Sequence, residues 1–316
     1  MASGRGLRFS LMVGGVCGVL IWGVSGADDM QPQVNITPRV RQSGAKHLTS
    51  NLRVDVKVVL VPVSVTDALD RPVHSLARNN FRILEDGVEQ KITMFSKEDG
   101  PISMGLLFDD SASMRGRVES SLDALKCLFQ TTLPGDEYFL VEFSDKAHLV
   151  CPFTREPEEI MTTLGRVKAK GWTALLDAIA MGAHQMRRAQ NSRKTLLILS
   201  DGNDNNSRFT ESEIRTLVME SDLRVYGIGL CTKPKLLQRL AEETGGDVLV
   251  VNHMEELPDA VQRLSREIRS EYVLGYATTN DVADARYRRV KVELVPPSGS
   301  PPLRASWRRG YFAPRD

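Results

Sequence analysis

Three segments of this sequence carry oxygen-bearing side chains that suit metal chemistry. In residues 109–113, Asp109, Ser111 and Ser113 alternate with spacer residues, so an extended turn can direct three oxygen atoms at one point. Thr173 in the segment 171–173 and Asp201 in the segment 200–202 offer further donors. Hard cations such as Mg²⁺ prefer oxygen ligands of this kind. These segments are therefore candidates for one divalent-metal site.

The elements that must position these residues belong to an α/β domain over residues 100–270. Short apolar runs alternate with amphipathic stretches there, which is typical of a mostly parallel, doubly wound sheet with helices on both faces. A strand over 147–151 follows its predecessor through a link too short for a crossover helix, so it should run antiparallel. Such sheets bind ligands at the carboxyl ends of their strands, and the segments at 109 and 200 directly follow predicted strands. The other strands are predicted at 102–108, 137–143, 195–199, 223–230 and 247–251, and the helices at 118–129, 158–167, 174–189, 211–220, 236–243 and 255–269.

Both flanks of this domain read as β-structure. In the flank 52–97, alternating valines predict a first strand, and Asp86-Gly87 predicts a hairpin between residues 81–85 and 91–95. In the flank 271–314, strands are predicted at 271–276, 287–294 and 303–312. Neither flank is large enough for a core of its own. We therefore expect the two flanks to pair into one smaller β-sandwich.

The first 26 residues have the pattern of a signal peptide, because Arg5 and Arg8 precede an apolar run from Leu11 to Val24 and small residues follow. The alternative is an uncleaved anchor, but the apolar run is shorter than the roughly 20 residues that span a bilayer. We expect an exported protein, in the periplasm, at the cell surface or secreted, with a flexible leader at 27–50 and no membrane span after cleavage. The formal net charge of +1 gives no electrostatic case for nucleic acid. The oligomeric state stays open.

The order of the three metal-binding segments resembles the metal-ion-dependent adhesion site (MIDAS) of von Willebrand factor type A (VWFA) domains. The resemblance rests on Asp-x-Ser-x-Ser after the first strand, Gly-x-Thr-Ala-Leu-x-Asp-Ala around Thr173, and Ser-Asp-Gly after the fourth strand, and it covers residues 102–270. It implies a Rossmann-like, six-stranded sheet of order 3-2-1-4-5-6. It also implies direct ligation of Mg²⁺ or Mn²⁺ by Ser111, Ser113 and Thr173, with Asp109 and Asp201 binding through waters or directly.

The flanks look like a bacterial VWFA-related family of the acidobacterial type, over residues 52–314. Phe81-Arg82-Ile83-Leu84-Glu85-Asp86-Gly87 and Arg309-Gly310-Tyr311-Phe312-Ala313-Pro314 carry that likeness. Ala112 departs from it, because glycine is usual between the two serines.

The function that this resemblance implies is protein binding, in adhesion or in the assembly of envelope complexes. A cation held mostly by neutral hydroxyls keeps net positive charge, so an acidic side chain of a partner can complete its coordination. The side chains expected at the rim are Trp172, Asp110, Asn203 and Asp204, although Trp172 is equally compatible with packing on a neighbouring loop and the segment 203–205 with a solvated loop.

Two other functions are compatible with the sequence. One is a structural module whose metal site stabilises the fold and recognises nothing. A hydrolase is the more distant alternative, because Ser200 lies outside the Gly-x-Ser-x-Gly pattern and no triad is evident. We therefore expect a protein that is not an enzyme.

Overall fold

The computed structural model of this chain describes residues 58–297, 299 and 301–315. The predicted signal peptide (1–26), the predicted leader (27–50) and the start of the first predicted strand lie outside the described residues. Among the described residues, no helix is both long and apolar enough to cross a membrane.

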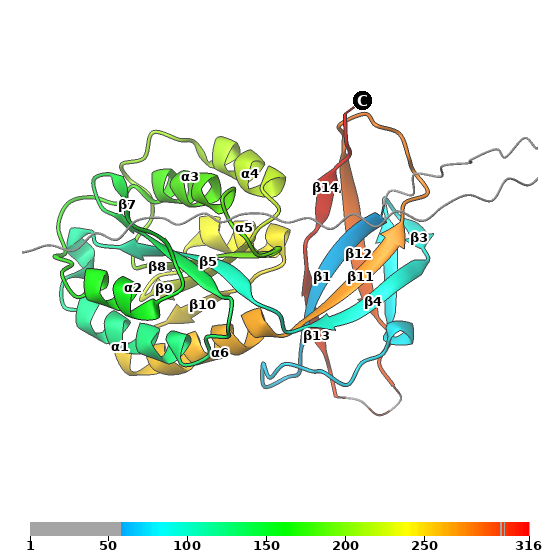
Figure 1. Cartoon of the computed structure of the whole chain (residues 1–316), viewed down its shortest axis with the longest axis horizontal. Coiled ribbons are helices and arrows are strands. Elements are labelled where there is room, and N and C mark those ends of the chain that lie inside the picture. Colours follow the sequence, from blue (N-terminus) through cyan, green and yellow to red (C-terminus); the bar gives the residue numbers. More distant parts are fainter. Residues whose placement is uncertain (1–57, 298, 300, 316) are drawn as a thin grey trace, which may run out of the picture. The chain divides into compact units, whose positions relative to one another are not determined.

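The α/β domain is a six-stranded sheet with helices on both faces (Figure 1). Its strands lie in the order β10-β9-β8-β5-β6-β7, and β7 is the strand that runs antiparallel to its neighbour. The predicted order, with an antiparallel third strand, is thus confirmed. The elements in chain order are β5 (Ile102–Asp109), η2 (Ala112–Met114), α1 (Val118–Phe129), β6 (Glu137–Phe143), β7 (Ala147–Thr154), α2 (Pro157–Leu164), α3 (Leu175–Met186), β8 (Arg193–Ser200), α4 (Glu211–Glu220), β9 (Arg224–Leu230), α5 (Lys235–Thr244), β10 (Val248–Val251), η3 (Met254–Glu256) and α6 (Leu257–Arg269).

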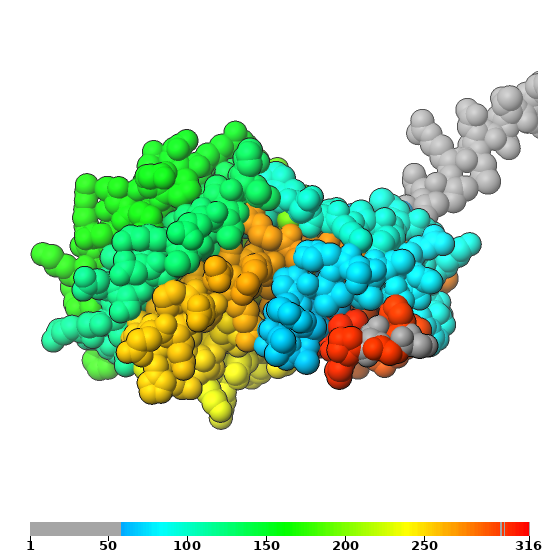
Figure 2. Space-filling model, turned by 90° about the horizontal axis from the view of Figure 1, so that it is seen from below, coloured from blue at the N-terminus to red at the C-terminus, as the bar shows by residue number. Residues whose placement is uncertain are grey.

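The helix α6 shows how sequence periodicity places a helix on this sheet. Its residues Leu257, Val261 and Leu264 recur at helical spacing and are fully buried. One stripe of the helix therefore faces the sheet while Asp259, Gln262 and Arg266 face outward. Figure 2 shows that outer surface in yellow to orange.

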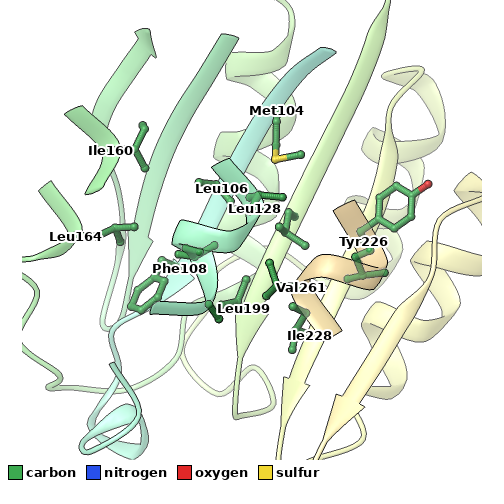
Figure 3. Packing of buried hydrophobic residues seen from close by; sticks show 14 of the residues in the cluster. Met104, Leu106, Phe108, Leu128, Ile160, Leu164, Leu199, Tyr226, Ile228 and Val261 are labelled. Atoms are coloured by element: carbon green, nitrogen blue, oxygen red, sulfur yellow. The ribbon is translucent and has the colours of Figure 1, made fainter. Parts of the chain in front are cut away.

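Both faces of the sheet are apolar, and each is covered by three helices. On one face α1, α2 and α6 pack against Met104, Leu106 and Phe108 of β5 (Figure 3). On the other face α3, α4 and α5 pack around Leu107 and Phe139. Every residue of β5 is buried. A central strand that is covered on both faces has a continuous apolar sequence. The apolar run at residues 102–108 is therefore sufficient to predict this strand.

The β-sandwich combines strands from both flanks, as the sequence predicts. One sheet has the order β13-β1-β11-β4 and the other β14-β12-β2-β3. The antiparallel pairs β1–β11 and β2–β12 each join an N-terminal to a C-terminal strand. Val63, Ile83, Leu274 and Val292 are buried in one core shared by the two sheets. The elements are β1 (Val58–Thr66), η1 (Arg78–Asn80), β2 (Phe81–Glu85), β3 (Val88–Gln90), β4 (Ile92–Glu98), β11 (Glu271–Ala277), β12 (Tyr287–Leu294), β13 (Arg304–Trp307) and β14 (Gly310–Phe312).

Two predictions within the flanks are wrong in the same way. The hairpin partner of β2 is β3, and the predicted arm 91–95 belongs instead to β4 in the other sheet. Likewise, the predicted strand 303–312 is divided into β13 and β14, which lie in different sheets. At Gly310 an added Cβ would lie 2.1 Å from the backbone oxygen of Arg288, so the approach of β14 requires glycine.

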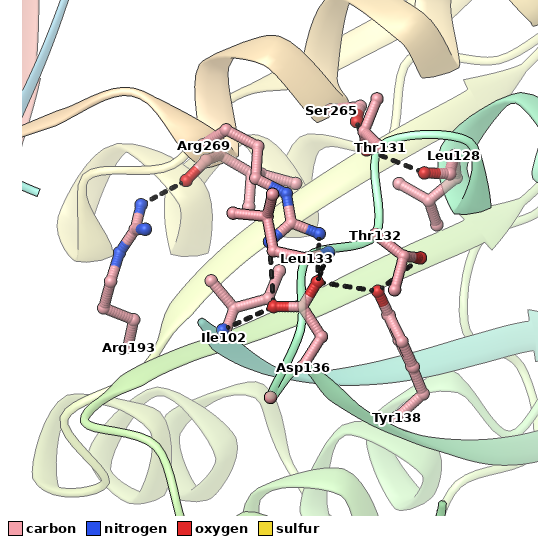
Figure 4. A network of polar contacts seen from close by, with 12 residues as sticks. Ile102, Leu128, Thr131, Thr132, Leu133, Asp136, Tyr138, Arg193, Ser265 and Arg269 are labelled. Carbon is pink, nitrogen blue, oxygen red and sulfur yellow. Dashed lines mark hydrogen bonds and ion pairs between the residues drawn. The ribbon is translucent and has the colours of Figure 1, made fainter. Parts of the chain in front are cut away.

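A buried ion pair anchors the start of the central strand to the end of α6 (Figure 4). The Arg269 guanidinium donates to the two carboxylate oxygens of Asp136 at 2.9 and 2.7 Å. The Ile102 amide donates to Oδ1 of the same carboxylate at 2.8 Å. Burial disfavours the Asp136 charge, but these hydrogen bonds outweigh it and hold the pKa of Asp136 below its ordinary value. A bidentate pair fixes direction as well as distance. It therefore sets the position of the strand that ends at Asp109.

A second buried charged group lies between β9, β1 and β11. Arg224 donates to the hydroxyl of Ser64 at 2.9 Å and pairs with Glu271 at 2.8 Å. Glu267 of α6 is buried nearby, and burial, with a further contribution from the Asp247 charge, raises the pKa of Glu267 to about 7. This carboxyl is therefore a group whose ionisation state affects folding near neutral pH.

Candidate metal site

Two neighbouring parallel strands bring the two candidate carboxylates to the same edge of the sheet. Asp109 is the last residue of β5, and Asp201 follows the last residue of β8. In the strand register Phe108 lies opposite Leu199. The loops that follow these strands therefore start side by side, as strand order predicts.

The first loop and Asp201 are linked by a chain of hydrogen bonds. Asp109 accepts the Ser111 amide at 2.9 Å, and the Ser111 hydroxyl lies 3.0 Å from that of Ser113. The Ser113 hydroxyl donates to Asp201 at 2.7 Å. Four of the five predicted ligands are thus in one cluster. The Ser200 hydroxyl, buried beneath them, donates to the other oxygen of Asp109 at 2.5 Å.

Thr173, in the loop before α3, lies next to the loop that follows Asp201. Its backbone oxygen accepts the amides of Asn205 and Asn206 at 3.0 and 3.2 Å, and its amide donates to the Asn205 side chain at 2.9 Å. A Cβ added to Gly202 would lie 3.5 Å from the Thr173 hydroxyl oxygen. The hydroxyl therefore faces the residue that directly follows Asp201.

Backbone contacts also fix the Thr173 loop to the first loop. The Ala112 amide donates to the Gly171 oxygen at 3.1 Å, and the Lys170 amide donates to the Asp110 oxygen at 2.8 Å. Gly171 adopts a φ of 80°. An added Cβ there would lie 2.6 Å from a carboxylate oxygen of Asp145, which accepts the Trp172 amide. Glycine is therefore required for this turn, and the protein backbone itself holds the three loops together.

The candidate ligands differ in accessibility in a way that suits a site open on one side. Asp109, Ser111, Thr173 and Asp201 are buried, whereas Ser113 is exposed. Because Ser113 is the exposed one, solvent or a partner approaches the cluster past Ser113.

Burial raises the pKa of Asp109 above its ordinary value, and the nearby Asp201 charge raises it further. The hydrogen bonds from Ser111 and Ser200 act in the opposite direction but do not outweigh burial.

A guanidinium already neutralises the buried carboxylate of Asp201. Arg117, in the turn before α1, forms an ion pair with Asp201 and donates to the Ser113 backbone oxygen at 3.1 Å. The Asp201 side chain is fully buried, while that of Arg117 is 30% exposed. The sequence alone does not indicate Arg117 as a site residue, because nothing in local spacing links it to a residue 84 positions later. This contact shows that the cluster attracts positive charge.

The four predicted rim residues divide into two pairs. Trp172 is 64% exposed and Asn203 is exposed, so both side chains are available to a partner. Asp110 is half-buried, and its Oδ1 has no hydrogen-bond partner among the described residues. Asp204 accepts the Leu176 amide at the start of α3 at 3.2 Å, and the hydroxyl of Ser207 also donates to it. Asp204 therefore has a role in capping α3.

The donors of this cluster fit a hard divalent cation. Two carboxylates and three hydroxyls supply oxygen, with no nitrogen or sulfur donor among them, which suits Mg²⁺ or Mn²⁺ better than softer ions. The described residues contain no group of three or more His, Cys, Asp and Glu side chains placed to hold a metal. This cluster instead combines two carboxylates with three hydroxyls.

Comparison with known families supports the identity of the domain. Residues 104–203 match the sequence model of the von Willebrand factor type A domain. No curated protein matches the sequence. The narrower likeness to the acidobacterial type stays a prediction.

Several solved structures are similar in fold. One is a von Willebrand factor type A protein from Catenulispora acidiphila, with 12% identity and a TM-score of 0.49, covering 83% of this chain and 75% of that chain. Another is proximal thread matrix protein 1 from the mussel byssus, described with a zinc-occupied MIDAS motif, with 16% identity and a TM-score of 0.48, covering 56% of this chain and 49% of that chain. The PilB minor pilin from Streptococcus sanguinis has 15% identity and a TM-score of 0.44, covering 54% of this chain and 61% of that chain. Likenesses this distant establish no shared function.

Proposed function

We propose, since residues 104–203 match the sequence model of the von Willebrand factor type A domain, that this chain is an exported, non-catalytic protein that binds an acidic side chain of a protein partner through Mg²⁺ or Mn²⁺. Asp109, Ser111, Ser113, Thr173 and Asp201 would hold the ion. Its chemical contribution is positive charge, which hydroxyl ligands leave largely uncompensated. Export rests on the pattern of residues 1–26.

The observation that carries the proposal is the convergence of oxygen donors from three loops. The hydroxyls of Ser111 and Ser113 lie 3.0 Å apart, and Ser113 links them to Asp201. Asp109 sits beneath them and orients the first loop through the Ser111 amide. The exposed side is formed by Ser113 and Trp172, so a partner carboxylate has access to the ion from solvent.

A purely structural role for the metal is less consistent with the loop contacts. The three loops are already joined by backbone hydrogen bonds between Ala112 and Gly171 and between Asn205 and Thr173. These bonds need no ion. Removal of metal should therefore weaken partner binding much more than it lowers the melting temperature.

The test uses a variant that removes one donor without disturbing the core. Ser113→Ala deletes an exposed hydroxyl and should weaken Mg²⁺ binding at least about tenfold in calorimetry. The metal-dependent capture of envelope proteins should be lost with it. Ser212→Ala, at an exposed serine of α4, is the matched control and should change neither quantity.

Two results would count against the proposal. One is Mg²⁺ and Mn²⁺ affinity in Ser113→Ala equal to that of the unmodified protein. The other is full partner capture in the presence of EDTA.

A further inference from the structure

A basic groove lies on the β-sandwich side of the chain, outside the candidate metal site. It has a volume of about 930 Å³, which is in the range of ligand-binding cavities. We call it the C-terminal groove, and its lining includes Leu84, Tyr287, Arg289, Lys291, Trp307 and Arg309. Arg215 of α4 and Glu243 of α5 also line it.

One arginine that lines the C-terminal groove stacks on a tryptophan ring. The Arg309 guanidinium carbon lies 3.9 Å from the centre of the Trp307 ring. The Trp307 ring is itself held, because its Nε1 donates to the Val290 oxygen at 2.9 Å. A guanidinium stacked on a fixed aromatic ring keeps its N–H groups free and directed. Arg309 is therefore prepared to bind a planar oxyanion.

Four basic side chains line the groove against two acidic ones, Asp86 and Glu243, and Asp86 accepts the backbone amide of Arg289 at 2.9 Å, not its guanidinium. Glu243 is engaged by Arg215 at 2.7 Å, and Lys291 pairs with Glu293 at 2.7 Å. Arg289 and Arg309 are exposed and have no carboxylate partner among the residues that the structure describes. Because a guanidinium fork matches a carboxylate in two parallel hydrogen bonds, the two arginines suit acidic side chains.

We propose that the C-terminal groove binds an acidic peptide segment of a protein partner, independently of metal. Arg289 and Arg309 would take two carboxylates, and the apolar walls formed by Leu84, Tyr287 and Trp307 would take an adjacent aromatic or aliphatic side chain. These walls favour a peptide over a nucleic acid, which would need a longer basic stripe to follow its phosphates. The site goes beyond the proposed function, because it lies outside the three metal-binding loops and uses no ion.

The experiment measures binding of a fluorescent peptide of alternating glutamate and phenylalanine to the full chain, in EDTA. The double variant Arg289→Ala/Arg309→Ala should weaken binding at least about tenfold, because two charge-assisted contacts are lost. The matched control Arg78→Ala/Arg166→Ala removes the same charge from exposed arginines elsewhere and should change affinity less than about twofold. A peptide with glutamine in place of glutamate should not bind.

Each other outcome would overturn the inference. Equal losses in the two double variants would show attraction by net charge alone, as would equally tight binding of polyphosphate or duplex DNA. Absence of binding to the unmodified protein at millimolar peptide would also overturn it. Because EDTA removes divalent metal throughout, this experiment does not depend on the proposed metal site. The groove proposal and the metal-site proposal can therefore fail independently of each other.

Discussion

At the scale of single residues, the site is set by side chains that hold other side chains in place. Ser200 is an example, because its buried hydroxyl donates to Asp109 and thereby orients a predicted ligand. Asn205 acts on the other side, where it fixes the backbone of Thr173. Such contacts restrict the rotamers of the donor groups, which a metal site needs if it is to select its ion.

Arg117 allows a prediction about how this site takes up metal. Its guanidinium occupies one oxygen of Asp201, so a cation has to compete with it. Arg117→Gln should therefore tighten Mg²⁺ binding by about tenfold, while the metal-free protein melts at a lower temperature because a buried carboxylate loses its partner. Calorimetry and thermal unfolding measure the two effects.

Arg115→Gln is the control for this prediction, since it removes the same charge from an exposed residue of the same turn. It should alter neither the affinity nor the melting temperature. Weaker Mg²⁺ binding in Arg117→Gln alone would contradict competition and would make Arg117 a residue that positions Asp201.

The residue contacts also show what local sequence can predict. The five candidate ligands were identified because each follows a strand or precedes a helix within a recognisable segment. The contacts of Arg117 with Asp201 and of Ser200 with Asp109 join residues 84 and 91 positions apart. No spacing rule describes such pairs, because they depend on which strands become neighbours.

At the scale of elements, the α/β domain was more predictable than the sandwich. Each strand of the α/β domain except β6 is followed by a change of period, from an apolar run to helical spacing, which marks its end. Between β3 and β4, and between β13 and β14, the chain changes sheets while its β-pattern continues. Apolar alternation alone therefore predicts the strands, but it does not predict where the chain passes from one sheet to the other.

The buried carboxyl of α6 gives a prediction of pH dependence. Because the pKa of Glu267 is raised to about 7, its protonated form favours folding. That contribution is fully present below the unfolded-state value of about 4.3 and is lost as the pH rises through about 7. Glu267→Gln, which stays neutral, should be more stable than the unmodified protein by roughly 3–4 kcal/mol at pH 8, and by only about 1 kcal/mol at pH 5.

Thermal unfolding at the two pH values tests this prediction. Glu242→Gln, at an exposed glutamate of α5, should leave stability unchanged at both. If Glu267→Gln is destabilised at pH 8, then the charged carboxylate is needed there, most directly by Arg224.

At the scale of the whole molecule, the two proposed sites would bind acidic groups by different means. Two of the three proposed metal-binding loops follow β5 and β8, neighbouring strands in the middle of the sheet, and β5 is buried along its whole length. The C-terminal groove would use Arg289 and Arg309 of the sandwich instead, the second stacked on Trp307. Composition did not reveal the groove, because the formal charge of +1 averages over local clusters.

The central claim is that five side chains from three loops share one divalent ion. The most direct measurement is an anomalous difference map from crystals soaked in Mn²⁺. We expect a single peak within about 2.5 Å of the hydroxyl oxygens of Ser111, Ser113 and Thr173, with Asp109 and Asp201 next to it. A map without a peak there at millimolar Mn²⁺, or with a peak that Thr173 does not reach, would contradict the account.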